Sequence, residues 1–188
     1  MKKIILSAIM LFFFAAAVHA QSSVQFGLKA GANLATLTND TNLDPDHRTA
    51  FHAGALAHIH LGRRFALQPE VMFSAQGAEY TNYRRDKINY VNVPVLGQYM
   101  IGNGLRLQTG PQIGFLTNAE SKNGNTEMDF ENSLKKTDFS WSFGAGYLTR
   151  SGLGIDARYN LGLSDISKNN TGLKNRVWQI GLFYQFGS

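Results

Sequence analysis

Apolar and polar side chains alternate along the chain in eight separate segments. In the first, residues 24–34, Val, Phe, Leu and Ala occupy one face, and Gln, Lys, Asn and Gly occupy the other. Successive side chains of a β-strand point to opposite sides, so a period of two residues predicts a strand with two unlike faces. The other seven segments are residues 51–61, 65–76, 91–101, 105–115, 139–147, 153–163 and 177–186. The pattern predicts an all-β chain.

The connections between these segments alternate in length. Three are tight and rich in glycine, at residues 62–64, 102–104 and 150–152, whereas four are long and polar, at residues 38–50, 78–89, 116–138 and 164–176. An even number of strands, with short turns at one end and long loops at the other, is typical of outer-membrane barrels with both termini in the periplasm. The predicted fold is therefore an eight-stranded antiparallel up-and-down transmembrane β-barrel.

The two faces could be oriented in two ways. A soluble periplasmic ligand-binding barrel would turn its apolar face inward, whereas a membrane barrel turns it toward lipid. The apolar faces carry no charged residue and one threonine, Thr109. The opposite faces are rich in Gly and Gln and carry few charges, unlike a soluble surface. We therefore expect the apolar faces to meet lipid and the polar faces to line the lumen.

Aromatic side chains on the apolar faces gather near the strand ends, as interfacial girdles do. One girdle is predicted from Phe26, Phe65, Tyr99, Tyr147, Tyr184 and Phe186 at the turn end, and the other from Phe51, Phe115, Phe139, Trp141 and Trp178 at the loop end. Three of the four prolines, Pro69, Pro94 and Pro111, fall inside predicted strands. Because proline cannot donate to a strand ladder, we expect bulges or ladder gaps beside them.

Residues 1–20 have the composition of a secretory signal peptide. A basic start, Met1 to Lys3, precedes an apolar run, and Val18 and Ala20 fit a cleavage site before Gln21. The run is too short to span a bilayer as a helix, so we expect cleavage and a barrel domain at residues 21–188. The 188-residue chain has no cysteine, which excludes disulfides, thiol catalysis and an N-terminal lipid anchor.

Several stretches resemble the PorT-like family of outer-membrane β-barrels, which share their architecture with OmpA and OmpX. The matching residues are Gly27–Leu34, Leu67–Phe73, Val91–Leu96, Gly110–Gly114 and Asp156–Leu163, in the expected order over nearly the whole mature chain. The chain end, Tyr184 to Ser188, resembles the aromatic terminal strand that the barrel-assembly machinery reads, although Phe186 is not the last residue. The resemblance implies an outer-membrane barrel, and the family name belongs to a component of a secretion pathway.

The predicted lumen contains titratable side chains that must pair when buried. We expect a polar network of Lys29, His58, His60, Glu70, Arg106, Asp156 and Arg158, in which Glu70 and Asp156 neutralise the cations and plug the barrel. A narrow conduction path is the alternative. His58 and His60 could share a metal, but a polar lining is the simpler interpretation, and we assign no metal, cofactor or catalytic residue. The acidic residues of 116–138 lack the spacing of an EF-hand calcium loop.

The sequence thus favours a non-enzymatic outer-membrane protein with structural or surface-interaction roles. Outer-membrane lipids, lipopolysaccharide and the barrel-assembly machinery are the expected partners, with a surface or secretion partner bound through loop 116–138. A transport or secretion-accessory role is the alternative. No basic cluster is interleaved with aromatic residues, so no nucleic-acid partner is expected.

Overall fold

The computed structural model describes residues 24–38, 46–80, 84–123, 126–169 and 171–187. The predicted signal peptide, residues 1–20, and its cleavage site lie outside these ranges. No helix in the described part of the chain is long and apolar enough to cross a membrane.

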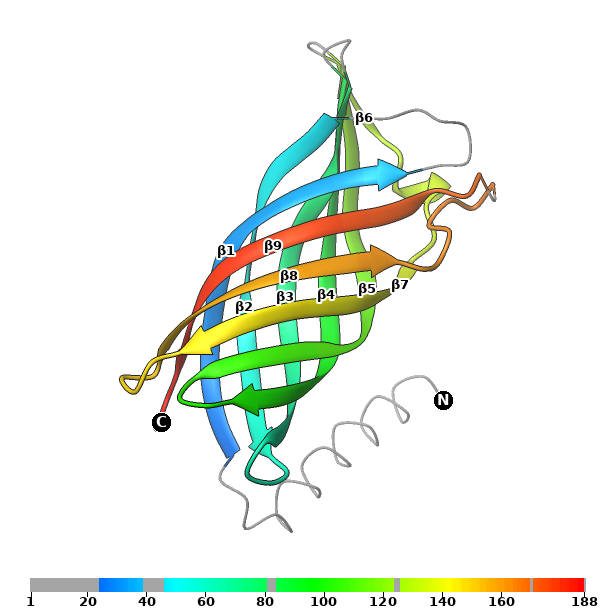
Figure 1. Ribbon diagram of the computed structural model, residues 1–188. Coiled ribbons are helices and arrows are strands. Elements are labelled where there is room, and N and C mark those ends of the chain that lie inside the picture. The colour runs from blue at the N-terminus through cyan, green and yellow to red at the C-terminus, as the bar shows by residue number, and fades with distance from the viewer. Residues whose placement is uncertain (1–23, 39–45, 81–83, 124–125, 170, 188) are drawn as a thin grey trace.

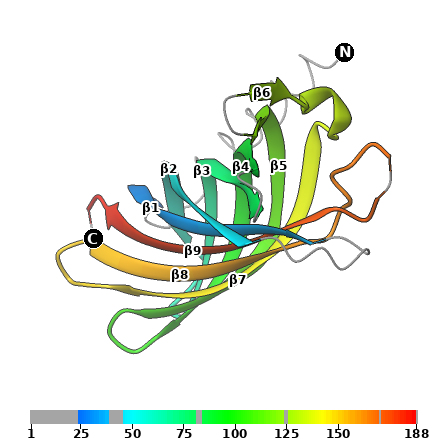
Figure 2. The ribbon, with the colours of Figure 1, turned by 90° about the horizontal axis from the view of Figure 1, so that it is seen from above.

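The long strands wind into a tilted barrel (Figures 1 and 2). Each pairs antiparallel with the next, and the first pairs with the last, so the sheet closes on itself. The eight strands are β1 (Val24–Thr38), β2 (Asp46–His60), β3 (Phe65–Tyr80), β4 (Arg84–Ile101), β5 (Leu105–Asn123), β7 (Thr137–Leu148), β8 (Leu153–Gly162) and β9 (Lys174–Gln185). The predicted fold class is confirmed.

The strand register fixes the tilt of the barrel. Followed through every ladder in turn, the register leaves β5 at Arg106 and returns to β5 at Leu116, ten residues further along. With a rise of about 3.3 Å per residue and about 4.8 Å between strands, this displacement corresponds to a tilt of about 40°. An eight-stranded barrel of this tilt has an interior that side chains can fill.

The strands extend further at the loop end than the sequence pattern predicts. Loop 78–89 was expected to be irregular, but β3 continues to Tyr80 and β4 begins at Arg84. Likewise the expected loop 116–138 contains the end of β5, the short strand β6 (Thr126–Asp129) and a 3₁₀ turn, η1 (Glu131–Ser133). β6 pairs with the end of β5. These predictions of loops were wrong because strands outside a bilayer no longer need an apolar lipid face.

Each of the three strand prolines lies at a gap in a ladder, as predicted. The β2–β3 ladder skips the positions around Pro69, the β3–β4 ladder those around Pro94, and the β4–β5 ladder those around Pro111. The pairing resumes in the same register on both sides of each gap, so the prolines remove ladder pairs without forming bulges. The ladders β1–β2, β1–β9, β5–β7, β7–β8 and β8–β9 run without interruption.

The orientation of the faces is that of a membrane barrel. Large apolar side chains such as Phe26, Leu28, Val71, Ile155 and Ile180 are more than half exposed on the outside. Lys29, Asn33, Gln68, Glu70, Asn160 and many other polar side chains are buried in the lumen. The alternative of a soluble barrel with an apolar interior is therefore wrong for the strands that would cross the membrane.

Candidate functional site

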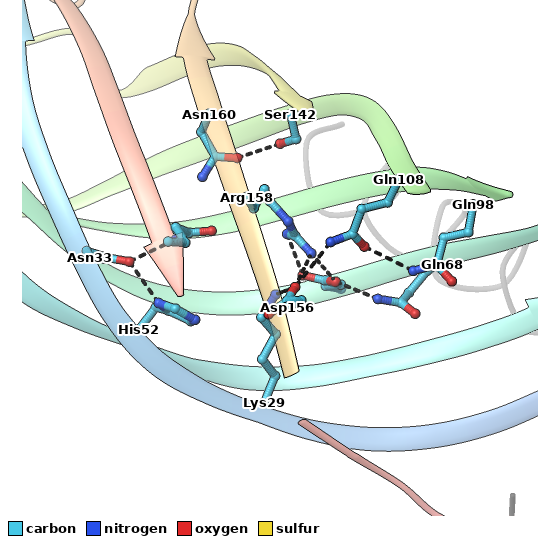
Figure 3. Close-up of polar contacts among 12 residues, drawn as sticks. Lys29, Asn33, His52, Gln68, Gln98, Gln108, Ser142, Asp156, Arg158 and Asn160 are labelled. Atoms are coloured by element: carbon cyan, nitrogen blue, oxygen red, sulfur yellow. Dashed lines mark hydrogen bonds and ion pairs between the residues drawn. The ribbon is translucent and has the colours of Figure 1, made fainter. Parts of the chain in front are cut away.

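A network of ion pairs fills the middle of the lumen (Figure 3). Arg158 of β8 donates two hydrogen bonds to Glu70 of β3, with Nη1–Oε2 at 2.9 Å and Nη2–Oε1 at 2.8 Å. Lys29 of β1 pairs with Asp156 of β8, whose Oδ2 also lies 3.5 Å from Arg158 Nη2. All four side chains are buried. β3 and β8 lie four strands apart in an eight-stranded barrel, so Arg158 and Glu70 bridge opposite walls.

Glutamine side chains extend this network. Gln68 donates to Glu70 Oε1 at 2.8 Å, and Gln108 donates to Asp156 Oδ2 at 3.1 Å. Gln98 in turn donates to Gln108 Oε1 at 3.0 Å. Hydrogen bonds to ionised groups are stronger than those between neutral groups. The carboxylates are therefore held by cations and amides together, as a buried ionic cluster requires.

A second group of buried amides and hydroxyls lies between the ion pairs and the loop end. Asn33 donates to Ser74 Oγ at 3.0 Å and to the Ala75 carbonyl at 2.7 Å, and its Oδ1 lies 2.8 Å from His52 Nδ1. Across the lumen, Ser142 donates to Asn160 Oδ1 at 2.7 Å. This second group also ties separate strands together. Sequence analysis did not single out Asn33, although its inward position followed from the alternation.

At the loop end the lumen becomes apolar. A buried cluster there contains Leu37, Ala78, Ile88, Tyr90, Leu116, Ala119, Leu134 and Ile166, with Phe130 and Leu173 packed against it. On β4 the apolar side chains switch from the inner to the outer face between two neighbouring residues. Tyr90 is fully buried inside, whereas Val91 belongs to the outer apolar face. From Tyr90 to the loop end, apolar side chains predominate in the interior, with Asp86 and Asp138 buried among them. The cluster, here called the apolar cap, closes the loop end of the barrel.

Asp165 holds the segment that covers the apolar cap. Its Oδ1 accepts from the N–H groups of Ser167 at 2.8 Å and Leu173 at 3.0 Å, and its Oδ2 accepts from Gly172 at 3.0 Å. Desolvation opposes the charged form, but these N–H groups and the charge of Lys135 outweigh it and lower the pKa of Asp165 below its usual range. Ile166, fully buried, is thereby fixed over the lumen.

The turn end of the lumen holds the remaining residues of the predicted network. Arg106 and His58 are buried, and His60 is partly buried. The His58 and His60 rings meet edge to face with centroids 4.5 Å apart. Arg106 lies over the Phe183 ring, 6.0 Å from its centroid. The expectation that Glu70 or Asp156 neutralises the cations applies to Arg158 and Lys29, whereas Arg106 has no ion pair among the described residues.

The aromatic residues assigned to the two girdles lie on the outside of the barrel. At the turn end Phe65 contacts Tyr99 with ring centroids 5.2 Å apart, and Tyr184 contacts Phe186 at 5.3 Å. At the loop end Trp141 donates through Nε1 to Thr109 Oγ1 at 2.8 Å. Exposed side chains also include Phe26, Tyr147, Phe51, Phe115, Phe139 and Trp178. Their contact with the bilayer interfaces stays a prediction.

The arrangement of titratable side chains in the lumen bears on whether a metal could bind there. Within the described ranges, no three His, Asp or Glu side chains converge as metal ligands would. The carboxylates of Glu70 and Asp156 are occupied by Lys29, Arg158 and the glutamines. Such an arrangement fixes the shape of a barrel whose interior is filled with side chains.

A plugged, closed barrel with an apolar outer face defines an integral membrane barrel, and comparison with known proteins gives its family. Residues 19–168 match the family model described as outer membrane protein beta-barrel domain. The chain belongs to this family and is a protein of the outer membrane. No curated protein matches the chain.

Solved structures with the same fold include two bacterial proteins. Ail, the attachment invasion locus protein of Yersinia pestis, is 15% identical with a TM-score of 0.54, over 86% of this chain and 98% of Ail. Neisserial surface protein A is 11% identical with a TM-score of 0.57, over 87% of this chain and 99% of that protein. At these identities the likeness concerns the fold alone.

Proposed function

We propose that the protein is a non-enzymatic outer-membrane barrel whose loop end binds a partner at the cell surface. The observation that carries the proposal is the double closure of the lumen. The ion pairs of Arg158 and Lys29 bridge its centre, and the apolar cap fills its loop end. A barrel closed in this way has no wide path for solutes. The side chains available to bind a partner therefore lie on the strand extensions and loops.

The β5–β6 hairpin is the best candidate surface. It lies at the tip of the loop end (Figure 1), next to the β3–β4 hairpin, and Met128 of β6 is 66% exposed there. An exposed large apolar side chain surrounded by polar residues is a common feature of contact surfaces. Ail has been solved with a heparin analogue, sucrose octasulfate, which shows that a barrel of this fold can hold a surface ligand.

Shortening the β5–β6 hairpin tests the proposal. Glu120 pairs with Asp129, so residues 121–128 can be replaced by Asn-Gly, a two-residue hairpin turn, without disturbing the barrel. The matched control shortens the β3–β4 hairpin at the pair Ala78 and Asp86. Cross-linking and pull-down from whole membranes should lose a specific partner in the first variant and retain it in the control.

Conductance measurements provide the second part of this test. The intact protein in planar bilayers should show no large, stable open channels, and heat-modifiable gel migration should show that both shortened variants are folded. Large stable channels in the intact protein would contradict the plugged lumen and favour transport.

A secretion-accessory role is the second candidate, supported by the PorT-like resemblance of residues 156–163 and by charge at the turn end. The turns carry Arg63, Arg64 and Arg150 and no carboxylate at 61–64, 102–104 and 149–152. A basic turn end suits an acidic periplasmic partner. Replacing these three arginines by Gln should weaken periplasmic cross-links if secretion is the role, and should leave surface contacts unchanged.

The remaining expected partners follow from the membrane setting. Lipids and lipopolysaccharide would contact the outer apolar face, where Phe26 and Leu28 are more than half exposed. The barrel-assembly machinery would read β9 and Phe186, which is 49% exposed.

A further inference from the structure

Arg106 is a buried cation without a counter-charge. It is 6% exposed, and its Nη1 atom has no hydrogen-bond partner within the described residues. Its neighbours in the ladders are Met100 of β4 and Gly146 of β7, neither of which carries a charge. An unpaired buried charge is costly unless something neutralises it.

The part of the lumen from its middle to the turn end holds an excess of positive charge. Its buried cations are Lys29, Arg106 and Arg158, and its buried carboxylates are Glu70 and Asp156. Both carboxylates are already engaged by Arg158, Lys29 and glutamine amides. The other buried carboxylates among the described residues, Asp86 and Asp138, bond to Ser121, Asn175 and Ser164 at the loop end.

Two histidines with unused nitrogens lie in the same part of the lumen. Arg106 acts electrostatically on His58, which also lies beside His60. Both ring nitrogens of His58 and Nδ1 of His60 are buried and make no hydrogen bond of good geometry, although the Gln68 and Gln98 side chains lie beside the His58 ring. A shared metal ion would be repelled by Arg106, whereas an anion would be attracted to the guanidinium and to an imidazole N–H. The unbonded Oε1 atoms of Gln68 and Gln98 can accept the other imidazole N–H groups or water.

We propose that the turn end of the lumen binds a small inorganic anion of the chloride class between Arg106 and the two histidines. Because Arg106 as a whole is only 6% exposed, a bulky lipid headgroup cannot reach it, and a compact ion is the counter-charge that suits this place. Arg63, Arg64 and Arg150 in the turns raise the local concentration of anions at this end of the barrel.

Anion titrations of the refolded full barrel in a nonionic detergent test this site. Chloride replaces gluconate at constant ionic strength, and NMR follows the side-chain signals of Arg106 and His58 while urea unfolding follows stability. We expect saturable shifts of both signals and a rising urea midpoint with chloride. Crystals grown in bromide should show the ion within hydrogen-bond distance of Arg106.

Arg106→Gln removes the charge and provides the decisive variant, with Arg176→Gln, at an exposed position of β9 near the loop end, as the matched control. Arg106→Gln should weaken chloride binding at least tenfold, about 1.4 kcal/mol, and abolish the rise in the urea midpoint, whereas Arg176→Gln should bind within about twofold of the native affinity. Heat-modifiable migration checks that each variant folds. Equal chloride dependence in Arg106→Gln, or no saturable response in the native barrel, would show a merely hydrated lumen and overturn the proposal.

Discussion

Arg158 and Glu70 form a two-pronged ion pair across the full width of the lumen, from β8 to β3, with both N–O distances below 3.0 Å. The two residues are 88 positions apart in the chain. Because bidentate geometry fixes both side chains, this contact holds opposite walls of the barrel at one separation. Glu70 also accepts from Gln68, so the pair is embedded in further hydrogen bonds.

Breaking this pair on one side should destabilise the barrel strongly. Arg158→Met leaves Glu70 buried without its main partner, and we expect a loss of about 3–5 kcal/mol in the free energy of unfolding. The double variant Arg158→Met with Glu70→Leu removes both charges and should recover much of that loss. Urea unfolding from vesicles measures all the variants in one double-mutant cycle. A double variant as unstable as the sum of the single ones would show that the residues act independently.

On the lipid face, Thr109 serves as the partner for Trp141. Its hydroxyl accepts from the indole N–H at 2.8 Å and donates to the Ser142 carbonyl at 3.0 Å. Thr109→Val keeps the shape and removes both bonds, so we expect a loss of about 1–2 kcal/mol. Trp141→Phe in the Thr109→Val background should cost less than Trp141→Phe alone. Tryptophan fluorescence during unfolding checks the prediction, and an unchanged stability in Thr109→Val would contradict it.

The apolar cap should behave as a small packed core. Ile166 and Leu134 are buried in it, so Ile166→Ala and Leu134→Ala should each cost about 2–5 kcal/mol if unfolding of the cap is coupled to that of the barrel. If the cap opens without the rest of the barrel, the loss of stability will appear as faster amide exchange in residues 130–134 and 164–173 rather than in global unfolding. Leu163→Ala, on the exposed outer face, is the control and should leave that exchange unchanged.

Acid should loosen the segment that covers the cap. The lowered pKa of Asp165 in the folded protein means that its carboxylate stabilises the fold at pH values above its unfolded pKa. That contribution is lost as the pH falls through the lower folded pKa. Amide exchange at Gly172 and Leu173 should therefore accelerate in acid after correction for intrinsic rates. Asp165→Asn should show fast exchange already at neutral pH and little further change on acidification.

Much of the barrel could be predicted from the sequence because lipid imposes one rule on every strand that crosses it: apolar side chains point outward and polar side chains point inward. The alternation in 153–163 alone predicts that Asp156 and Arg158 point into the lumen. That rule ends at the membrane boundary. Ile88 and Tyr90 point inward as apolar residues, while the alternation below them puts apolar residues outward. The sequence pattern therefore predicts loops where the structure has the strand ends and the apolar cap.

The pairing inside the lumen could be predicted only in part. Burial required Glu70 and Asp156 to find cations, but alternation does not tell which strands face each other across the barrel. That depends on the closure of β1 on β9 and on the shear of the register. The alternation groups Arg106 with Lys29 and Arg158 because all three point inward, although Arg106 lies nearer the turn end and contacts Phe183 instead of a carboxylate.

The three proline gaps divide the wall of the barrel into two mechanically unequal halves. All three lie in the consecutive ladders from β2 to β5, beside Pro69, Pro94 and Pro111. The join between the two chain ends, β1 with β9, is unbroken over its length. When force or a thinning bilayer pulls the barrel open, the ladders of β3 and β4 should therefore separate first. The pairing of the first and last strands, β1 and β9, should be among the last to separate.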